Sequence, residues 1–514
     1  MNVGHAVARH AIQRPDAIAW FGQDGEATYR DLHVRTNRLA HVLTEELGVQ
    51  AGDRVALYVP NGRTVLEVMV ACAKVGAVYV GLNFRLDRRE LGQVLDNALP
   101  TVMIGCTEFE ELLVTACAER DIAYLGSDTD GPQGYAARCA AASADDHPAR
   151  FGPRPDDDAC IVYSSGTTGV PKGILFSFAA MLQHATVTAI EYDIAPDSRY
   201  LVQLPHNSSV NITFAPCLLR GAAIGMEDSR GFDPRRFAAR VQRDAVTHTF
   251  LVPTMLYRLL EQVEDDSQLD SLVVLAYGSS SIPAERVRQL VDRFGPKLIQ
   301  LYGMAEIASV GTLLRRDDHA RALSGEPILF ASAGRPSMGV VVRVVDPVTG
   351  ADAGVGERGE VIFGGPHVMT CYYRDVERTG EALVDGWMHS GDVGCLDEDG
   401  YLYIVDRIKD LVIRGGHNIA PKEVEEVLFN HPAVLEVAVV GLPDPEWGES
   451  LCAVVVLREG HDANAAGLAR WCTGQGLASI KVPSRFEIVP ELPKNLVGKF
   501  DKKAIVASLR GGGA

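Results

Sequence analysis

The residues best able to do chemistry stand together between Ser164 and Gly173, in the sequence Ser-Ser-Gly-Thr-Thr-Gly-Val-Pro-Lys-Gly. The segment follows an apolar stretch, 159–163, that predicts a buried strand. Glycines let the backbone approach a phosphate, consecutive N–H groups form an anion-binding nest, and hydroxyls add donors. Lys172 adds a mobile positive charge suited to outer phosphates. Pro171 stands where a Walker A loop has glycine, so the pattern indicates either another kind of phosphate loop or an ordinary surface turn.

The same loop resembles the signature of the adenylate-forming superfamily, which comprises acyl-CoA synthetases, luciferases and peptide-synthetase adenylation domains. Further segments resemble other motifs of that superfamily, in the order in which the superfamily carries them. They are Tyr302–Glu306, His389–Asp392, Asp406–Asp410 followed by Gly415–Asn418, and Pro493–Lys499. Because these motifs span nearly the whole chain, the chain is identified as a member of this superfamily, most like acyl- or aryl-CoA ligases.

The resemblance implies where ATP and its product AMP bind. Tyr302 would stack on adenine, and Asp392 would accept hydrogen bonds from the ribose hydroxyls, for which an ionised carboxylate is suited. Arg407 would assist at the ribose or the phosphates. The full set of implied nucleotide contacts is Ser164, Ser165, Gly166, Thr167, Thr168, Gly169, Lys172, Gly278, Ser279, Ser280, Tyr302, Gly303, Met304, Ala305, Asp392, Arg407 and Lys499.

The catalytic groups that the resemblance implies are Glu306, Lys172 and Lys499. Glu306, with Thr168, would hold Mg²⁺, a hard cation that takes carboxylate and phosphate oxygens. Lys499 would carry the adenylation step, because a cation between the attacking carboxylate and the α-phosphate stabilises the charge crowded into that transition state. Ala305 departs from the family pattern, which usually has threonine there. The alanine lacks the threonine hydroxyl, and losing one neutral hydrogen bond removes about 1 kcal/mol.

The resemblance also implies an acid-binding pocket near 204–213 and the glycine-serine segment 278–281. A histidine or an aromatic residue usually gates this pocket, and His206 is the candidate gate, with a structural histidine as the alternative. The implied pocket residues are His206, Ser208, Asn211, Gly278 and Ser280. Since Ser208 and Asn211 are polar where fatty-acid enzymes would be apolar, we expect a small, aromatic or polar acid rather than a long-chain fatty acid.

A mobile C-terminal lid is a further implication of the family. Lys409 aligns with the hinge about which the lid turns, and a hinge needs one or two residues that absorb a large φ/ψ change. Gly415 and Gly416 would allow close passage of coenzyme A in the second orientation. A surface lysine in a turn is the alternative for Lys409.

The elements that must position these groups alternate between helix and strand in the first half of the chain. This βαβ pattern predicts parallel sheets covered by helices. The elements expected there include helices at 29–47 and 63–75 and strands at 53–59, 77–80, 101–104 and 159–163.

The pattern changes further along the chain. Short strands separated by Gly and Asp turns predict a β-rich subdomain over about 330–408, and a separate mixed pattern follows. We therefore predict an α/β protein with a large N-terminal domain, 1–408, of two α/β layers plus the β subdomain. A small mobile α/β lid domain, 409–514, would carry the catalytic lysine.

Composition limits the partners. The net charge of −18 argues against binding nucleic acid or an anionic membrane surface, which needs a basic footprint. The ten cysteines are scattered without Cys-x-x-Cys spacing, so a structural zinc site is not expected. No apolar run reaches the roughly 18 residues of a membrane span, and we expect a cytoplasmic protein, monomeric or homodimeric.

The sequence thus predicts an ATP-, Mg²⁺- and coenzyme A-dependent ligase that forms an acyl-adenylate and then a thioester. A stand-alone adenylation enzyme that loads a carrier-protein thiol remains open. So does a ligase for another nucleophile or for a non-carboxylate oxyanion. The last alternative is an ATP-binding regulatory relative that has lost turnover.

Overall fold

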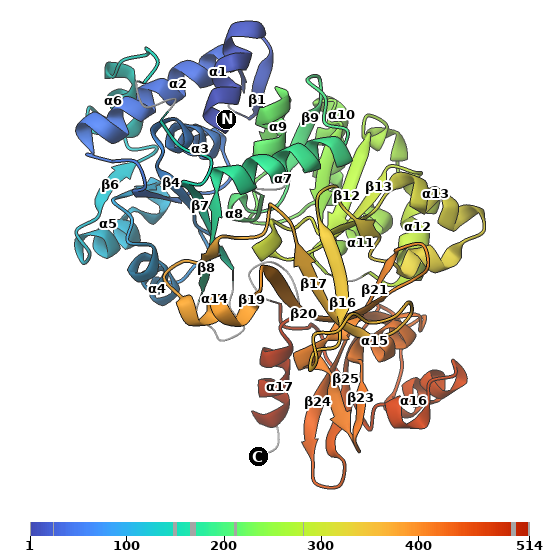
Figure 1. Ribbon diagram of the computed structural model, residues 1–514. Coiled ribbons are helices and arrows are strands. Elements are labelled where there is room, and N and C mark those ends of the chain that lie inside the picture. Colours follow the sequence, from blue (N-terminus) through green and yellow to red (C-terminus); the bar gives the residue numbers. More distant parts are fainter. Residues whose placement is uncertain are drawn as a thin grey trace.

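The computed structural model describes residues 2–23, 25–147, 152–164, 171–209, 213–280, 282–494 and 500–511. The chain is a mixed α/β protein, as predicted, with its large N-terminal part above and its small C-terminal part below in Figure 1. In the described residues, no helix is both long and apolar enough to cross a membrane.

Two large sheets form the N-terminal part. Their inner strands pair in parallel, which confirms the βαβ pattern expected from the sequence. The first sheet has the order β15 (Arg335–Pro336), β14 (Thr312–Leu314), β13 (Leu298–Tyr302), β12 (Val274–Gly278), β11 (His248–Leu251), β9 (Arg199–Val202), β10 (Ala223–Met226), β1 (Ile18–Gly22) and β2 (Gly25–Thr28). The second has the order β18 (Cys371–Tyr372), β8 (Lys172–Ser177), β7 (Asp158–Ser164), β4 (Val78–Gly81), β3 (Arg54–Tyr58), β5 (Val102–Gly105) and β6 (Ala123–Gly126).

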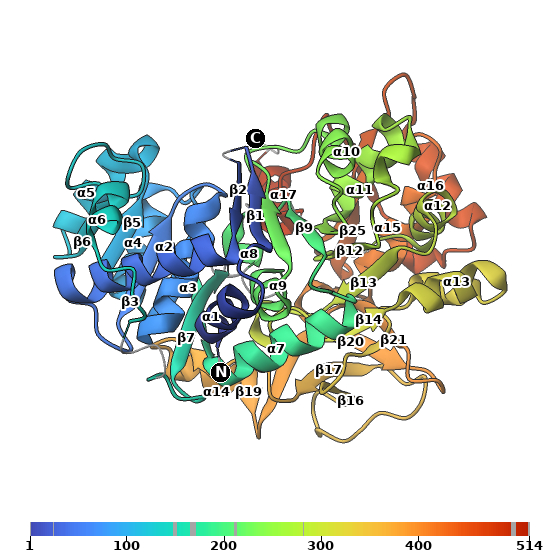
Figure 2. The same ribbon diagram turned by 90° about the horizontal axis from the view of Figure 1, so that it is seen from above.

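Helices fill the space between the two sheets and cover their outer faces. The central helix α3 is buried from Val65 to Val75, because one continuous core joins it to strands of both sheets. The middle layer comprises α1 (Val3–Gln13), α2 (Tyr29–His41), α3 (Arg63–Val75), α7 (Phe178–Glu191) and α9 (Ala215–Arg220). The outer helices are α4 (Arg88–Ala98) and α5 (Glu110–Ala118) on one sheet, and α10 (Pro234–Arg243), α11 (Pro253–Gln262), α12 (Ala284–Phe294) and α13 (Arg316–Ser324) on the other. Three short helices complete this part: α6 (Tyr135–Ala141), α8 (His206–Ser209) and α14 (Val376–Ala382). Figure 2 shows α7 running between the two halves.

The β-rich segment predicted beyond residue 330 folds as one mainly antiparallel sheet. Glycines with positive φ, such as Gly350 and Gly400, form turns in the connections between its strands. Its strands are β16 (Val341–Val345), β17 (Gly359–Gly364), β20 (Trp387–Leu396), β19 (Leu383–Val384) and β21 (Leu402–Arg407).

The C-terminal part has a sheet and two hydrophobic clusters of its own, one on each face of that sheet. The strands are β23 (His417–Ile419), β22 (Val412–Arg414), β25 (Gly448–Leu457), β24 (Val434–Asp444) and β26 (Arg485–Ile488). The helices are α15 (Pro421–Phe429), α16 (Ala465–Gly474) and α17 (Lys502–Gly511). A separate core is what an independent domain requires, and the boundary at 408/409 stays a prediction.

Candidate active site

The carboxyl ends of two neighbouring strands border the site. The parallel neighbours β12 and β13 end at Gly278 and Tyr302, so both chains leave the sheet at the same edge. Gly278 has no room for a side chain, because a Cβ atom would stand 2.3 Å from the carbonyl oxygen of Leu301. Ser279 follows with φ 75°, a left-handed conformation that turns the chain along this edge, and its side chain is exposed.

A tight turn presents Glu306. A Cβ atom at Gly303 would stand 2.4 Å from the carbonyl oxygen of Ser309, so the chain can close on itself only with glycine there. Ala308 and Ser309 both have positive φ, 52° and 75°. The turn leaves Glu306 8% exposed, with its carboxylate facing the neighbouring segment that carries Tyr372.

Tyr372 joins the acidic and the basic group of the site. Its hydroxyl donates to Oε1 of Glu306 at 2.7 Å, and Nζ of Lys172 lies 4.9 Å from the centre of its ring. The segment that carries Tyr372 is held between the two sheets, since Met369 N–H donates to the carbonyl of Glu306 and Thr370 N–H to that of Leu175. One phenol therefore fixes a carboxylate and a lysine that come from different sheets.

A second tyrosine orients the predicted ribose carboxylate. The hydroxyl of Tyr302 donates to Oδ2 of Asp392 at 2.7 Å, and Nε of Arg407 lies 3.2 Å from Oδ1. Asp392 and Arg407 stand opposite each other on β20 and β21, so the hairpin register brings this pair together. The N–H of Asp392 donates to Oγ of Ser390, which fixes the backbone at the carboxylate.

Burial keeps both phenols protonated. Desolvation, followed by the negative charge of the bonded carboxylate, raises the pKa of Tyr302 and that of Tyr372 well above the usual value of a phenol. Each tyrosine therefore stays a hydrogen-bond donor to its carboxylate at any physiological pH.

The donor set fits Mg²⁺ bound with a nucleotide. Among the described residues, no group of three or more His, Cys, Asp or Glu side chains could hold a metal ion. Glu306 offers one buried, oriented carboxylate near Lys172, and Mg²⁺ usually takes one or two carboxylates with phosphate oxygens and water.

Several predicted contacts lie outside the described residues. They are Ser165, Gly166, Thr167, Thr168, Gly169, Asn211 and Lys499, and also the side chain of Ser208. Of the others, Ser164 pairs with Lys172 across β7 and β8 at the mouth of the phosphate loop. Met304 and Ala305 are partly buried in the turn before Glu306, and Ser280 is exposed beside Ser279.

His206 lies in the core, which favours the structural alternative over the gate. Its side chain is 0% exposed, with Nε2 3.1 Å from the carbonyl of Val59 and Nδ1 3.3 Å from the hydroxyl of Tyr79. Burial lowers its pKa to about 4, so the ring stays neutral. A buried ring engaged on both sides in this way is typical of a packing histidine.

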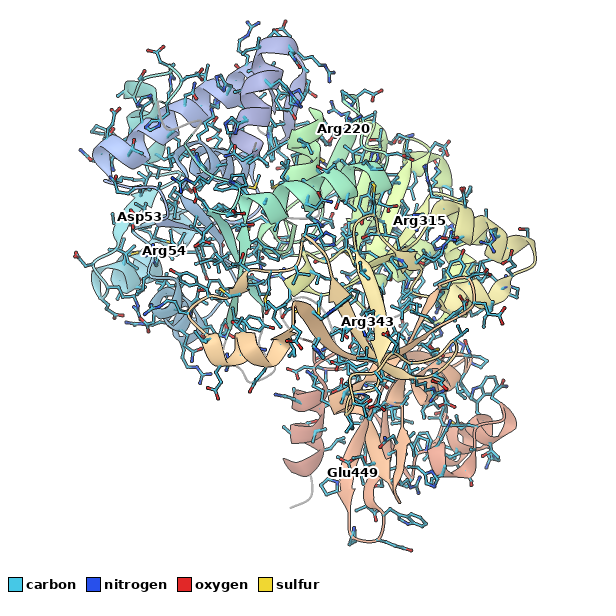
Figure 3. The ribbon with its side chains drawn as sticks, viewed as in Figure 1. Asp53, Arg54, Arg220, Arg315, Arg343 and Glu449 are labelled. Carbon is cyan, nitrogen blue, oxygen red and sulfur yellow. The ribbon has the colours of Figure 1, made fainter. Side chains whose placement is uncertain are left out.

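The predicted hinge and coenzyme A path lie at the junction and in the C-terminal part. Lys409 stands in a single 3₁₀ turn, Ile408–Asp410, that links β21 to β22. Gly415 and Gly416 form the turn between β22 and β23 with φ 57° and 80°. Glu449, which accepts from the N–H of Ile413 at the start of this hairpin, lies far down the C-terminal part in Figure 3.

Sequence reasoning missed Tyr372. The tyrosine stands 66 residues after Glu306, and only the pairing of β18 with β8 brings it to Lys172. A tyrosine shortly before an acidic helix start is a weak signal, so the sequence offered no strong pointer to it.

The fold is that of an adenylate-forming enzyme, and comparison with known proteins agrees. The model of the AMP-binding enzyme family matches residues 7–373, and that of the AMP-binding enzyme C-terminal domain matches 423–499. The chain belongs to the AMP-binding enzyme family and is an adenylate-forming ligase. The cofactors of such ligases, ATP, Mg²⁺ and coenzyme A, are those that the sequence predicted.

Two curated relatives align over almost their full length. The chain is 36% identical to the feruloyl-CoA synthase of an Amycolatopsis species, over 98% of each chain. It is 32% identical to the indoleacetate–CoA ligase of Aromatoleum aromaticum, over 98% of this chain and 97% of the relative. Two relatives whose names point to other acceptors are also similar. The chain is 31% identical to the fatty acid–[acyl-carrier-protein] ligase ScoC of Streptomyces coeruleorubidus, over 96% of this chain and 94% of the relative. It is 30% identical to the amide bond synthetase McbA of Marinactinospora thermotolerans, over 99% of each chain, with a TM-score of 0.89.

Solved structures add information on the arrangement of the two parts. ATP-bound MatB from Rhodopseudomonas palustris superposes with a TM-score of 0.90 at 29% identity, over 99% of each chain. Apo MatB from the same organism gives 0.79, again over 99% of each chain. The chain thus resembles the ATP-bound structure of this relative more closely than its apo structure.

Proposed function

We propose that the chain is an ATP-dependent ligase that couples an acid to coenzyme A. The acid carboxylate would attack the α-phosphate of ATP to give an acyl-adenylate and pyrophosphate, and the thiol would then displace AMP to give the thioester. The observation that carries this proposal is the contact of Tyr372 with both Lys172 and Glu306, next to the Tyr302–Asp392–Arg407 group.

Each of these residues has a task in the proposed reaction. Asp392 would accept the ribose hydroxyls while Tyr302 and Arg407 hold its carboxylate in place. Lys172 would neutralise the outer phosphates as pyrophosphate leaves. Mg²⁺ at Glu306 would offset the charge of the triphosphate. Lys499 would bridge the reacting carboxylate and phosphate oxygens.

The proposed acid is small, aromatic or polar. The polar residues Ser208 and Asn211 in the implied pocket support this, as do two relatives whose names specify an aryl acid. We propose the domain division at 408/409, with Lys409 as the hinge, for the same chemistry, because the thiol needs access once pyrophosphate has gone.

A pyrophosphate-release screen tests the proposal. Hydroxycinnamic and indole acids, short-chain acids, dicarboxylic acids, amino acids and palmitate are each supplied with ATP and Mg²⁺, with and without coenzyme A. We expect aryl acids to give the fastest release and AMP release coupled to coenzyme A consumption. Palmitate outperforming every small acid would overturn the substrate class, and no release with any acid would favour an ATP-binding regulatory relative.

Another acceptor is the second candidate. The similarity to ScoC and McbA favours testing a carrier-protein thiol and an amine as acceptors. Pyrophosphate release without coenzyme A consumption, together with loading of a carrier protein or formation of an amide, would support it. The cytoplasmic location and the choice between monomer and homodimer stay predictions.

A further inference from the structure

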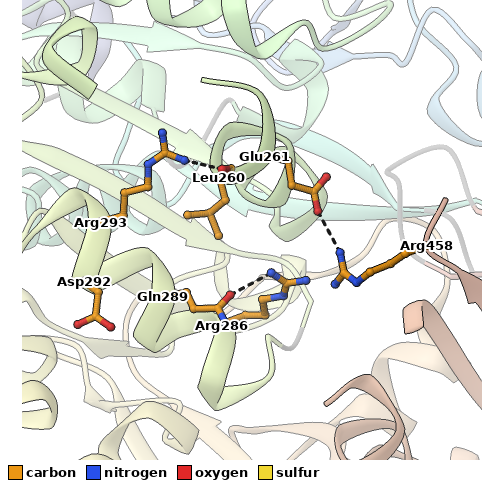
Figure 4. Close-up of a pocket in the computed structure, with 7 residues that line it drawn as sticks. All are labelled: Leu260, Glu261, Arg286, Gln289, Asp292, Arg293 and Arg458. Atoms are coloured by element: carbon orange, nitrogen blue, oxygen red, sulfur yellow. Dashed lines mark hydrogen bonds and ion pairs between the residues drawn. The ribbon is translucent and has the colours of Figure 1, made fainter. Parts of the chain in front are cut away.

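A groove outside the nucleotide site lies where the two parts of the chain meet. It has a volume of about 520 Å³ and is bounded by helices α11 and α12 of the N-terminal part and by the residue that follows β25. Figure 4 shows its lining residues: Leu260, Glu261, Arg286, Gln289, Asp292, Arg293 and Arg458. Most of these side chains are charged, and both signs are present. Arg458 comes from the C-terminal part and the others from the N-terminal part.

Arg286 contacts two aromatic rings, one from each part of the chain. Its guanidinium carbon is 5.4 Å from the ring centre of Tyr257 on α11 and 5.4 Å from that of Phe429, the last residue of α15. The two ring centres are 6.0 Å apart. A planar guanidinium can stack on aromatic faces, which a lysine ammonium cannot do. The cluster of these three side chains therefore joins α11 and α12 to α15.

An ion pair crosses the same junction. Nη1 of Arg458 lies 3.5 Å from Oε1 of Glu261. Desolvation, and next the positive charge of Arg458, lower the pKa of Arg286, while Glu261 acts in the opposite direction. Glu261 thus offsets the repulsion between two arginines that the docked C-terminal part brings together.

The position of these contacts gives them control over orientation. Near the linker, Lys422 donates from its N–H to Asp406 and from Nζ to the carbonyl of Ile404. Contacts so close to a pivot change little when a domain turns about it. Arg286 contacts Phe429 of α15, and Glu261 pairs with Arg458, which follows β25. Both contacts lie away from the linker, so a rotation of the C-terminal part would separate the partners.

We propose that Arg286 is a positioning residue for adenylate formation. With the Glu261–Arg458 pair, it holds the C-terminal part in the orientation that serves adenylate formation. This inference rests on the proposed function, because it assumes that Lys499 serves the first half-reaction. The groove is then a docking junction that must open before the second half-reaction.

Arg286→Ala tests the inference when the two half-reactions are measured separately. We expect pyrophosphate release to fall about 5- to 30-fold through kcat, with the KM for ATP nearly unchanged, since no nucleotide contact is lost. Attack of coenzyme A on supplied acyl-adenylate should stay within twofold of the wild type. Arg286→Lys should recover only part of the loss, because it keeps the charge without the planar stack.

Arg288→Ala is the matched control. Arg288 stands on the same helix, and its ion pairs with Glu285 and Asp292 stay within α12. Wild-type rates in Arg288→Ala support the inference. Equal losses in Arg288→Ala and Arg286→Ala, or equal losses of both half-reactions in Arg286→Ala, would overturn it. An inactive wild type would instead refute the proposed function.

Charge reversal tests the ion pair independently. Glu261→Arg and Arg458→Glu should each slow pyrophosphate release, and the double variant should recover most of the rate, because the pair is restored with opposite polarity. If the fold-decrease in pyrophosphate release of the double variant equals the product of the two single-variant decreases, a role for this pair is overturned. Unchanged melting temperatures in all variants would show that orientation, not folding, is affected.

Discussion

Tyr372→Phe is the most informative change in the site. The substitution keeps the aromatic ring beside Lys172 and removes only the hydroxyl that donates to Glu306. Glu306 is 8% exposed, so bulk water cannot easily replace the lost donor. The carboxylate would keep its place in the turn but lose the bond that sets its direction.

The size of the effect follows from that bond. A hydrogen bond to a charged group contributes about 1.5–3 kcal/mol, and about 1.4 kcal/mol corresponds to a factor of ten. Changes beside a metal ligand typically cost roughly 10- to 100-fold in metal affinity or activity. We therefore expect the apparent Mg²⁺ affinity for adenylation to fall roughly 10- to 100-fold, with only a small change in melting temperature.

The assay follows pyrophosphate release against Mg²⁺ concentration at saturating ATP and acid. Tyr403→Phe is the control, because the Tyr403 hydroxyl also donates to a carboxylate, that of Asp397, at 3.1 Å, within the β subdomain. The Tyr403→Phe variant should match the wild type. Coenzyme A attack on supplied acyl-adenylate should also be normal in the Tyr372→Phe variant.

Two outcomes would contradict this reasoning. An unchanged Mg²⁺ dependence in Tyr372→Phe would mean that Glu306 does not hold the metal or does not need the phenol. A loss that no Mg²⁺ concentration restores, shared by both half-reactions, would place Tyr372 in the fold rather than in metal binding.

Further predictions concern the ribose, the lysine and the hinge. Tyr302→Phe should raise the KM for ATP roughly 10-fold or more, since the buried Asp392 loses a charged hydrogen bond at 2.7 Å, and initial rates against ATP measure this. Lys499→Ala should lower adenylation by orders of magnitude and spare thiol attack on supplied adenylate; equal loss of both steps would contradict it. Lys409→Pro should spare pyrophosphate release and impair thioester formation, because proline fixes φ at the linker, and normal thioester formation would refute the hinge.

Local patterns predicted most of the backbone correctly. The helix expected at 63–75 is α3, Arg63–Val75, because its apolar residues recur at helical spacing and Gly76 ends it with φ 76°. The helix expected at 29–47 ends instead at His41, and a π-helical turn, Val42–Glu46, continues it. Periodicity finds an element but not the hydrogen-bond pattern of its last turn, which depends on packing.

The sequence by itself determined the chemistry and the order of the elements, because ordered motifs and apolar spacing are local properties of the chain. Only the tertiary structure decided that His206 is a core residue, that Tyr372 joins Lys172 to Glu306, and that Arg286 meets Phe429 across the junction. The physical reason is that these contacts link segments far apart in the chain. Which residues meet depends on how the sheets and helices pack, and the spacing of residues along the sequence does not reveal it.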